Sequence, residues 1–248
     1  MEKILKTLNG YSGSKIYLMS DDNKVFIRKI DNVDRNYERL IELKKLKYNV
    51  PSVYKKDNNV LDMEYIKGLD IKTYLSINNI DLLLNYIFDL IDNFSKISKE
   101  KDYTETYNKK LSWIDESKVF PFTKKELIDS LPPILPSSIY HGDLTLENII
   151  YDTNTFYLID CMTSDYDSWI FDLAKMRQDS NCFWFIRSTE DKNLKKYLSI
   201  IDDKIVKRYP ILKNNSLLIL MLLRVYLYTK DGSEDQKFIL KEIKRLWK

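Results

Sequence analysis

The strongest constraint on the fold lies between residues 140 and 160, where a short polar segment leads into two apolar runs. These runs, Ile149–Tyr151 and Phe156–Ile159, flank a stretch of Asp, Thr and Asn residues that is typical of a tight turn. The pattern predicts a β-hairpin. If its turn is centred on Asn154, Asn148 lies opposite Asp160 at the open end of the hairpin.

Three oxygen-bearing side chains are expected to meet at that open end. Asn148 and Asp160 arrive side by side, and Asp143 stands five residues before Asn148, at the other end of a short loop. Amide and carboxylate oxygens suit Mg²⁺, which prefers hard ligands. The chain has two cysteines and one histidine, too few for a four-ligand zinc site. Any metal must therefore be held by oxygen.

The string His141-Gly142-Asp143, followed by Asn148 and then by a strand ending at Asp160, resembles the aminoglycoside phosphotransferase and choline kinase superfamily. These enzymes are relatives of protein kinases. The resemblance implies that Asp143 orients and deprotonates the acceptor hydroxyl, while Asn148 and Asp160 hold Mg²⁺ on ATP. It also implies that ATP and Mg²⁺ are the cofactors and that the partner is a small-molecule hydroxyl acceptor.

The order of the predicted elements agrees with this resemblance, which implies an α+β, protein-kinase-like bilobal fold. Apolar alternation predicts an antiparallel meander over 4–30, a helix over 34–48 and a hairpin over 52–65. Helical patterns dominate afterwards, including 71–77, 81–98 and 239–247, while 99–118 and 131–136 are expected to be connectors. We expect a nucleotide-binding lobe at 1–65, a catalytic and acceptor-binding lobe at 66–248, and a hinge at about 64–69.

The small lobe is expected to bind the nucleotide. A glycine-bearing turn between its first two strands takes the place of a phosphate-covering loop, although it does not follow the G-x-G-x-x-G pattern. Met63–Gly68 resembles the hinge of the family, where backbone groups near Glu64 and Ile66 would bond adenine. The predicted loop residues are Gly10, Ser12, Gly13 and Ser14.

The third strand should deliver a cation to the phosphates, and it offers Arg28 and Lys29. Alignment with the kinase pattern Val-Ala-Ile-Lys favours Arg28, and it places Phe26 on the same strand face beneath adenine. The neighbouring register would choose Lys29. Glu38, on the following helix, matches the glutamate that pairs with this cation in the family, with Glu42 as the alternative.

Three further residues near the motif receive structural interpretations. His141 is expected to pack and to hydrogen-bond the catalytic loop without transferring a proton. Cys161 is not expected to be a reactive thiol. Asp172 resembles the aspartate that steadies the catalytic loop from the next helix.

Charge and hydropathy exclude several classes of partner. With 40 basic and 37 acidic residues, the net charge is only +3, and no single-sign block indicates nucleic-acid binding. The longest apolar run, Leu217–Leu223, is much shorter than the about 20 residues that cross a bilayer, so no membrane insertion is expected. The N-terminus lacks the apolar run of a secretory signal, and a cytoplasmic location is predicted.

The acceptor is the least constrained part of the prediction. The sequence of the segment Asp172–Met176 favours, as the acceptor, a hydroxyl on a sugar or sugar derivative of cell-surface polysaccharide synthesis. Choline or ethanolamine would need an aromatic and acidic cage, and an aminoglycoside would need acidic groups, whereas the chain ends in a Lys- and Arg-rich helix. A nucleotide-binding pseudokinase is the non-enzymatic alternative. The candidate cage residues are Asp165, Tyr166, Asp167, Trp169, Trp184 and Phe185.

Overall fold

The chain divides into two compact units, and the loop before Asn148 contributes to both. A computed structural model describes residues 2–9, 13–21, 24–114 and 119–247. The first unit comprises Met1–Asn78, His141–Asp143 and Glu147–Ser164. The second comprises Asn79–Tyr140, Leu144–Leu146 and Asp165–Lys248.

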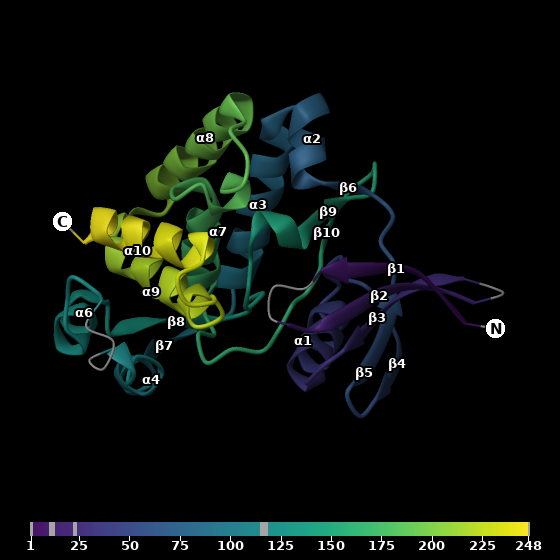
Figure 1. Cartoon of the computed structure of the whole chain (residues 1–248), viewed down its shortest axis with the longest axis horizontal. Coiled ribbons are helices and arrows are strands. Elements are labelled where there is room, and N and C mark those ends of the chain that lie inside the picture. Colours follow the sequence, from purple (N-terminus) through teal and green to yellow (C-terminus); the bar gives the residue numbers. More distant parts are fainter. Residues whose placement is uncertain (1, 10–12, 22–23, 115–118, 248) are drawn as a thin grey trace. The chain divides into compact units, whose positions relative to one another are not determined.

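A five-stranded antiparallel sheet opens the first unit (Figure 1). The strand order is β1-β2-β3-β5-β4, so the meander and the following hairpin pair through the central β3 and β5. The predicted meander and hairpin are therefore confirmed, and they join into one sheet. Its strands are β1 (Lys3–Asn9), β2 (Lys15–Ser20), β3 (Val25–Ile30), β4 (Val53–Asp57) and β5 (Val60–Glu64).

The helix of this sheet, α1 (Asp34–Lys45), buries one face at helical spacing: Asn36, Arg39, Leu40 and Leu43. It packs against β4, and Figure 1 shows it beside the sheet. The sequence predicts that this helix extends to Tyr48, but it ends at Lys45. The reason is that Lys47 adopts a left-handed backbone with φ of 66°.

A second, three-stranded sheet completes the first unit with the order β10-β9-β6. It joins the predicted hairpin, β9 (Ile149–Tyr151) and β10 (Phe156–Leu158), to β6 (Leu69–Asp70). Gly68 is required here, because a Cβ at this position would lie 2.4 Å from the Tyr151 carbonyl oxygen. The helix α2 (Ile71–Ile77) follows directly, and the Asp70 side chain accepts a hydrogen bond from the backbone of Thr73 at its start.

The second unit is mainly helical, and α7 lies at its centre. Every residue of α7 from Ile170 to Ser180 is buried, and the helix contacts α3, α8 and α9. The apolar run Leu217–Leu223 is buried within α9. The helices are α3 (Ile80–Ser95), α4 (Thr104–Lys110), α6 (Lys124–Ser130), α7 (Trp169–Ser180), α8 (Lys192–Arg208), α9 (Asn215–Tyr226) and α10 (Glu234–Leu246). None of the described helices is long and apolar enough to span a membrane.

The expected connectors contain a two-stranded antiparallel sheet that the sequence does not indicate. Its strands are β7 (Ser98–Asp102) and β8 (Ile134–Ser138). The strand β7 has the sequence Ser-Lys-Glu-Lys-Asp and is largely exposed, so it lacks the apolar alternation by which strands are recognised. Pro136 also makes β8 difficult to predict from the sequence, since proline is rare within strands. The α+β class with antiparallel sheets is nevertheless confirmed.

Candidate active site

The hairpin that carries Asn148 has a register one residue different from the predicted one. Leu158 pairs with Ile149, and the Ile159 N–H donates to the Asn148 carbonyl oxygen at 2.9 Å. Asn148 therefore faces Ile159, and Asp160 lies one residue beyond this pair. The cause is the turn, in which the Asp152 carboxylate accepts hydrogen bonds from the backbone of the two residues before β10, Asn154 and Thr155.

The catalytic-loop residues of the first unit are joined by direct hydrogen bonds. The Asn148 side-chain NH₂ donates to the Asp143 carbonyl oxygen at 2.9 Å, and the Asp143 N–H donates to His141 Nδ1 at 3.2 Å. Because Nδ1 accepts, Nε2 carries the proton and donates to the Ile159 carbonyl oxygen at 3.0 Å. These bonds join Asp143 to both strands at the open end of the hairpin, directly to Asn148 before β9 and through His141 to Ile159 after β10.

His141 is fully buried, and burial lowers its pKa to about 4. The neutral ring suits its one accepted and one donated hydrogen bond. These contacts agree with the predicted packing role.

We expect the single histidine to make the stability of the protein depend on pH. Its pKa is near 6.5 when unfolded and about 4 when folded, so the unfolded state binds more protons between these values. Its stabilising contribution is present above pH 6.5 and declines as the pH falls toward 4. Urea unfolding should show about 2 kcal/mol less stability at pH 5 than at pH 7 from this group alone. An equal pH dependence in His141→Asn would contradict this assignment.

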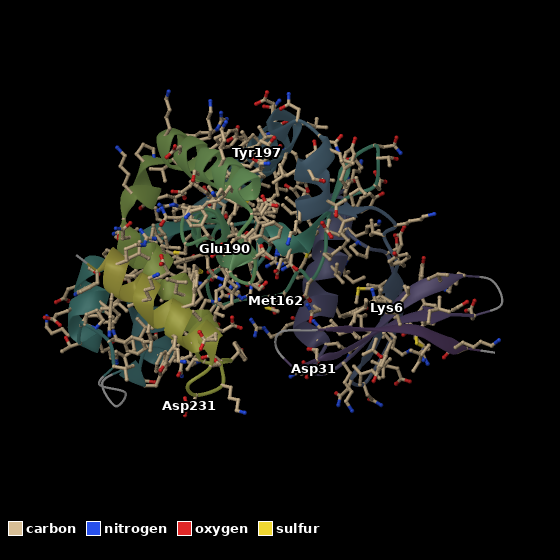
Figure 2. All side chains as sticks on the ribbon, turned by 45° about the horizontal axis from the view of Figure 1, so that its top comes forward. Lys6, Asp31, Met162, Glu190, Tyr197 and Asp231 are labelled. Atoms are coloured by element: carbon tan, nitrogen blue, oxygen red, sulfur yellow. The ribbon has the colours of Figure 1, made fainter. Side chains whose placement is uncertain are left out.

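The backbone at Gly142 approaches the segment after Asp160 too closely for any side chain. Gly142 has φ of +94°, and a Cβ there would lie 2.0 Å from the Met162 carbonyl oxygen. The Met162 N–H also donates to the His141 carbonyl oxygen at 3.0 Å. Met162 is labelled in Figure 2. The glycine thus allows the two segments that carry Asp143 and Asp160 to meet.

Asp160 is held by side chains from two other elements of the first unit. Its Oδ1 accepts hydrogen bonds from Lys29 Nζ at 2.7 Å and from Asn36 Nδ2 at 3.1 Å. Burial raises the pKa of the Asp160 carboxyl, the Asp143 carboxylate acts in the same direction, and Lys29 opposes the rise. The hydrogen bonds from His141 to Ile159 and from Met162 to His141 bring the segments that carry the two carboxylates together.

Arg28 and Lys29, the two candidate cations of β3, have different partners. Arg28 donates two hydrogen bonds to Asp62, both at 2.7 Å, and also pairs with Glu2. Lys29 instead lies 5% exposed against Asp160. The reason is strand alternation, which turns neighbouring residues to opposite faces of β3. These contacts favour Lys29, the residue of the neighbouring register, and the role of either residue toward phosphate stays a prediction.

Phe26 is affected by the same alternation. It shares a sheet face with Arg28, whose guanidinium lies 5.4 Å from the centre of its ring, and so it does not lie on the Lys29 face. The residue of β3 that shares the Lys29 face is Ile27, and the role of Phe26 toward adenine stays a prediction. Pairing across β2, β3 and β5 places Ile27 on one face with Leu18 and Met63.

Glu38 does not lie on the side of α1 that meets Asp160. It is exposed, whereas the buried face of the helix presents Asn36 and Arg39. The alternative, Glu42, pairs with Arg39 at 3.0 Å. Asn36 is the site residue that sequence reasoning missed, and its helical spacing with Leu40 and Leu43 was the available signal.

The predicted phosphate-covering loop is described only at its end. Gly10 and Ser12 lie outside the described residues. Gly13 has a left-handed φ of +84°, and the Ser14 hydroxyl donates to Asp31 at 2.5 Å. This bond lowers the pKa of Asp31, and Asp31 is labelled in Figure 2. Ser14 is thus anchored at the base of the loop by the residue that follows β3.

The predicted hinge begins where β5 ends. The Glu64 N–H donates to the Ser52 carbonyl oxygen at 2.8 Å, and its carboxylate accepts from the Ser52 N–H at 3.0 Å. Beyond it, residues 65–67 have no regular structure, and Ile66 is buried. The roles of Glu64 and Ile66 toward adenine stay predictions.

Lys29 and Arg28 give a direct test of the strand register. We expect Lys29→Ala to lower kcat/KM for ATP at least about tenfold, the scale for losing a hydrogen bond from a charged group. Arg28→Ala should change kcat/KM less but lower the Tm, because it leaves buried Asp62 without its guanidinium partner. Steady-state kinetics and thermal melting of both variants show which of the two residues binds the phosphates. A larger loss of kcat/KM in Arg28→Ala would assign this role to Arg28.

Comparison with known proteins identifies the family of the chain. A family model described as "Phosphotransferase enzyme family" matches residues 28–202, which is more than half of the sequence. The chain belongs to this family. The predicted resemblance and the assignment as a kinase-type phosphotransferase that acts on a small-molecule hydroxyl are thereby confirmed. No curated protein matches the phosphotransferase significantly.

Solved structures support the fold of the phosphotransferase. Choline kinase LicA from Streptococcus pneumoniae is 20% identical, with a TM-score of 0.60, and the match covers 98% of this chain and 93% of that one. Aminoglycoside phosphotransferase APH(4)-Ia is 12% identical, with a TM-score of 0.66, over 99% and 93%. A thermostable mutant of APH(4)-Ia, 12% identical over 97% and 92% with a TM-score of 0.65, is a ternary complex with AMP-PNP and hygromycin B. At these identities the likeness concerns the protein-kinase-like fold alone.

Proposed function

We propose that this phosphotransferase transfers the γ-phosphate of ATP to a hydroxyl of a small molecule. The observation that carries the proposal is the meeting of Lys29, Asp143, Asn148 and Asp160 within the first unit. A cation, a carboxylate suited to accept a proton and two oxygen ligands are the groups that phosphoryl transfer requires. The AMP-PNP complex of the similar APH(4)-Ia structure supports a nucleotide as the donor.

We place the nucleotide against the Lys29 face of the five-stranded sheet. Ile27, Leu18 and Met63 would contact the adenine, and backbone groups near Glu64 and Ile66 would bond its edge. The Lys29 ammonium would bind phosphate oxygens, a contact that charge-assisted hydrogen bonds make strong.

The donor set around Asp160 fits Mg²⁺. The NH₂ group of Asn148 is used by Asp143, so its amide oxygen is the atom suited to a cation. Asp160 engages its described partners through Oδ1, which leaves Oδ2 as the second hard ligand. When bound, Mg²⁺ would neutralise charge that develops on the phosphates.

Asp143 would orient the acceptor hydroxyl and take its proton. Its backbone is fixed from both sides, by His141 through the N–H and by Asn148 through the carbonyl. A positioned carboxylate of this kind is the usual base in kinase-type transfer.

For the acceptor, we propose a neutral or anionic sugar or sugar derivative, of the kind used in cell-surface polysaccharide synthesis. Two of the four aromatic residues considered for a cationic cage already contact protein cations: the Arg187 guanidinium lies 3.9 Å from the centre of a Trp184 ring, and that of Arg224 lies 5.4 Å from the Tyr166 ring centre. The nearby acid Asp165 pairs with Lys110. A quaternary ammonium group would have to displace these partners.

An acceptor panel tests this charge preference. We expect turnover with neutral hexoses or anionic sugar derivatives to exceed turnover with choline, ethanolamine or kanamycin-type amines by roughly tenfold or more at equal concentration, because each uncompensated buried charge is costly. ADP release should be measured at fixed MgATP with each compound. Efficient turnover of the amines alone would overturn the acceptor class and leave the phosphotransferase assignment intact.

A further inference from the structure

The helix α1 lacks the acidic partner that a kinase-type lysine is expected to find. Glu38 is exposed, and Glu42 pairs with Arg39. In the part of the chain that the structure describes, Lys29 forms its ion pair with Asp160. At the same place, α1 presents the uncharged Asn36, which is 4% exposed.

Asn36 uses its amide to hold two consecutive residues after β10. Nδ2 donates to the Asp160 carboxylate at 3.1 Å and to the Cys161 carbonyl oxygen at 2.9 Å. An amide NH₂ has two hydrogens, so both bonds can form together. One bond fixes the side chain of Asp160, and the other fixes the backbone that follows it.

This double contact acts on a residue with an uncommon backbone. Asp160 has φ of +55°, in the left-handed region that few residues other than glycine, asparagine and aspartate adopt. Fixing Cys161 from α1 restricts the peptide that follows Asp160. Because both Lys29 and Asn36 engage Oδ1, they turn the same oxygen away from a cation and leave Oδ2 to bind it.

From these contacts we infer that Asn36 is a positioning residue for the metal ligand Asp160. The inference rests on the proposed function, in which Asp160 binds Mg²⁺. A neutral amide orients the carboxylate without cancelling its charge. A glutamate at the same place would instead set a second negative charge against Asp160. In this chain, α1 therefore acts on the metal ligand itself, through an amide and not through an ion pair with Lys29.

The test measures how much Mg²⁺ strengthens ATP binding, without any turnover. Calorimetric titration with ATP is carried out once with Mg²⁺ and once with EDTA, on wild type, Asn36→Ala, Asn36→Leu and Glu38→Ala. The leucine variant keeps the approximate shape of asparagine and lacks its hydrogen-bond donors, so it covers the case in which alanine prevents folding. The matched control is Glu38→Ala, which removes an exposed acid from the same helix.

We expect the gain in affinity from Mg²⁺ to fall at least about fivefold in both Asn36 variants, since one charge-assisted hydrogen bond is lost. Binding in EDTA should stay within about twofold, and Glu38→Ala should match wild type in both conditions. An unchanged gain in the Asn36 variants, or an equal loss in Glu38→Ala, would overturn the role of Asn36 alone. A wild-type protein whose ATP binding ignores Mg²⁺ would overturn the metal site together with this inference.

Discussion

Asp143→Asn is expected to abolish most of the phosphoryl transfer while preserving the fold and ATP binding. The substitution keeps the shape of the side chain but removes the group that accepts the proton of the hydroxyl. Losing a positioned base costs about a hundredfold or more in kcat. The backbone bonds of residue 143 to His141 and Asn148 do not involve the carboxylate, so the loop should keep its conformation.

Turnover and ATP affinity of Asp143→Asn should be measured together. A large fall in kcat with an ATP dissociation constant close to that of wild type is the expected pattern. The exposed Asp57, at the end of β4, provides a control, since Asp57→Asn should leave both quantities unchanged. Near wild-type turnover in Asp143→Asn would remove the proposed base from the mechanism.

Asp160→Ala is expected to be the second most damaging substitution, because it removes a full negative charge from the proposed metal site. We expect kcat/KM to fall by about a hundredfold and the Mg²⁺ concentration for half-maximal activity to rise. Asn148→Ala should show the same change to a smaller degree, since an amide oxygen is a neutral ligand. Asp160→Ala also leaves Lys29 without its carboxylate partner, so the Tm of this variant must be compared with that of wild type.

Activity measured across a Mg²⁺ titration separates the loss of a metal ligand from the loss of the Lys29 ion pair. If Asp160 binds the metal, high Mg²⁺ should restore part of the lost rate in Asn148→Ala and less in Asp160→Ala. An unchanged Mg²⁺ dependence in Asp160→Ala would show that the metal binds elsewhere.

The sequence predicts which of the proposed site residues lie near one another when they are close together in the chain. Asp143, Asn148 and Asp160 fall within one loop and one hairpin, so short-range spacing is sufficient to bring them together. The structure places them near each other even though the hairpin register differs by one residue. That difference arose because the Asp152 turn holds two central residues instead of three.

Residues that reach the site from other elements are predicted less well. Arg28 and Lys29 are adjacent, and only tertiary contact with Asp62 on one face and Asp160 on the other separates their roles. For α1, charge suggests Glu38, whereas packing turns Asn36 toward the site. The β7–β8 pairing is not predicted either, because β7 is polar and largely exposed and therefore lacks an apolar pattern.

The proposed chemistry is tested most directly by mass spectrometry of a phosphoryl-transfer reaction. Wild-type protein and Asp143→Asn are each incubated with MgATP and a mixture of neutral sugars, anionic sugar derivatives, choline, ethanolamine and aminoglycosides. We predict a phosphorylated compound that forms with wild type, is absent without Mg²⁺, and is reduced by about a hundredfold with Asp143→Asn. Nucleotide binding by both proteins without any phosphorylated product would contradict the account and indicate a nucleotide-binding module without catalysis.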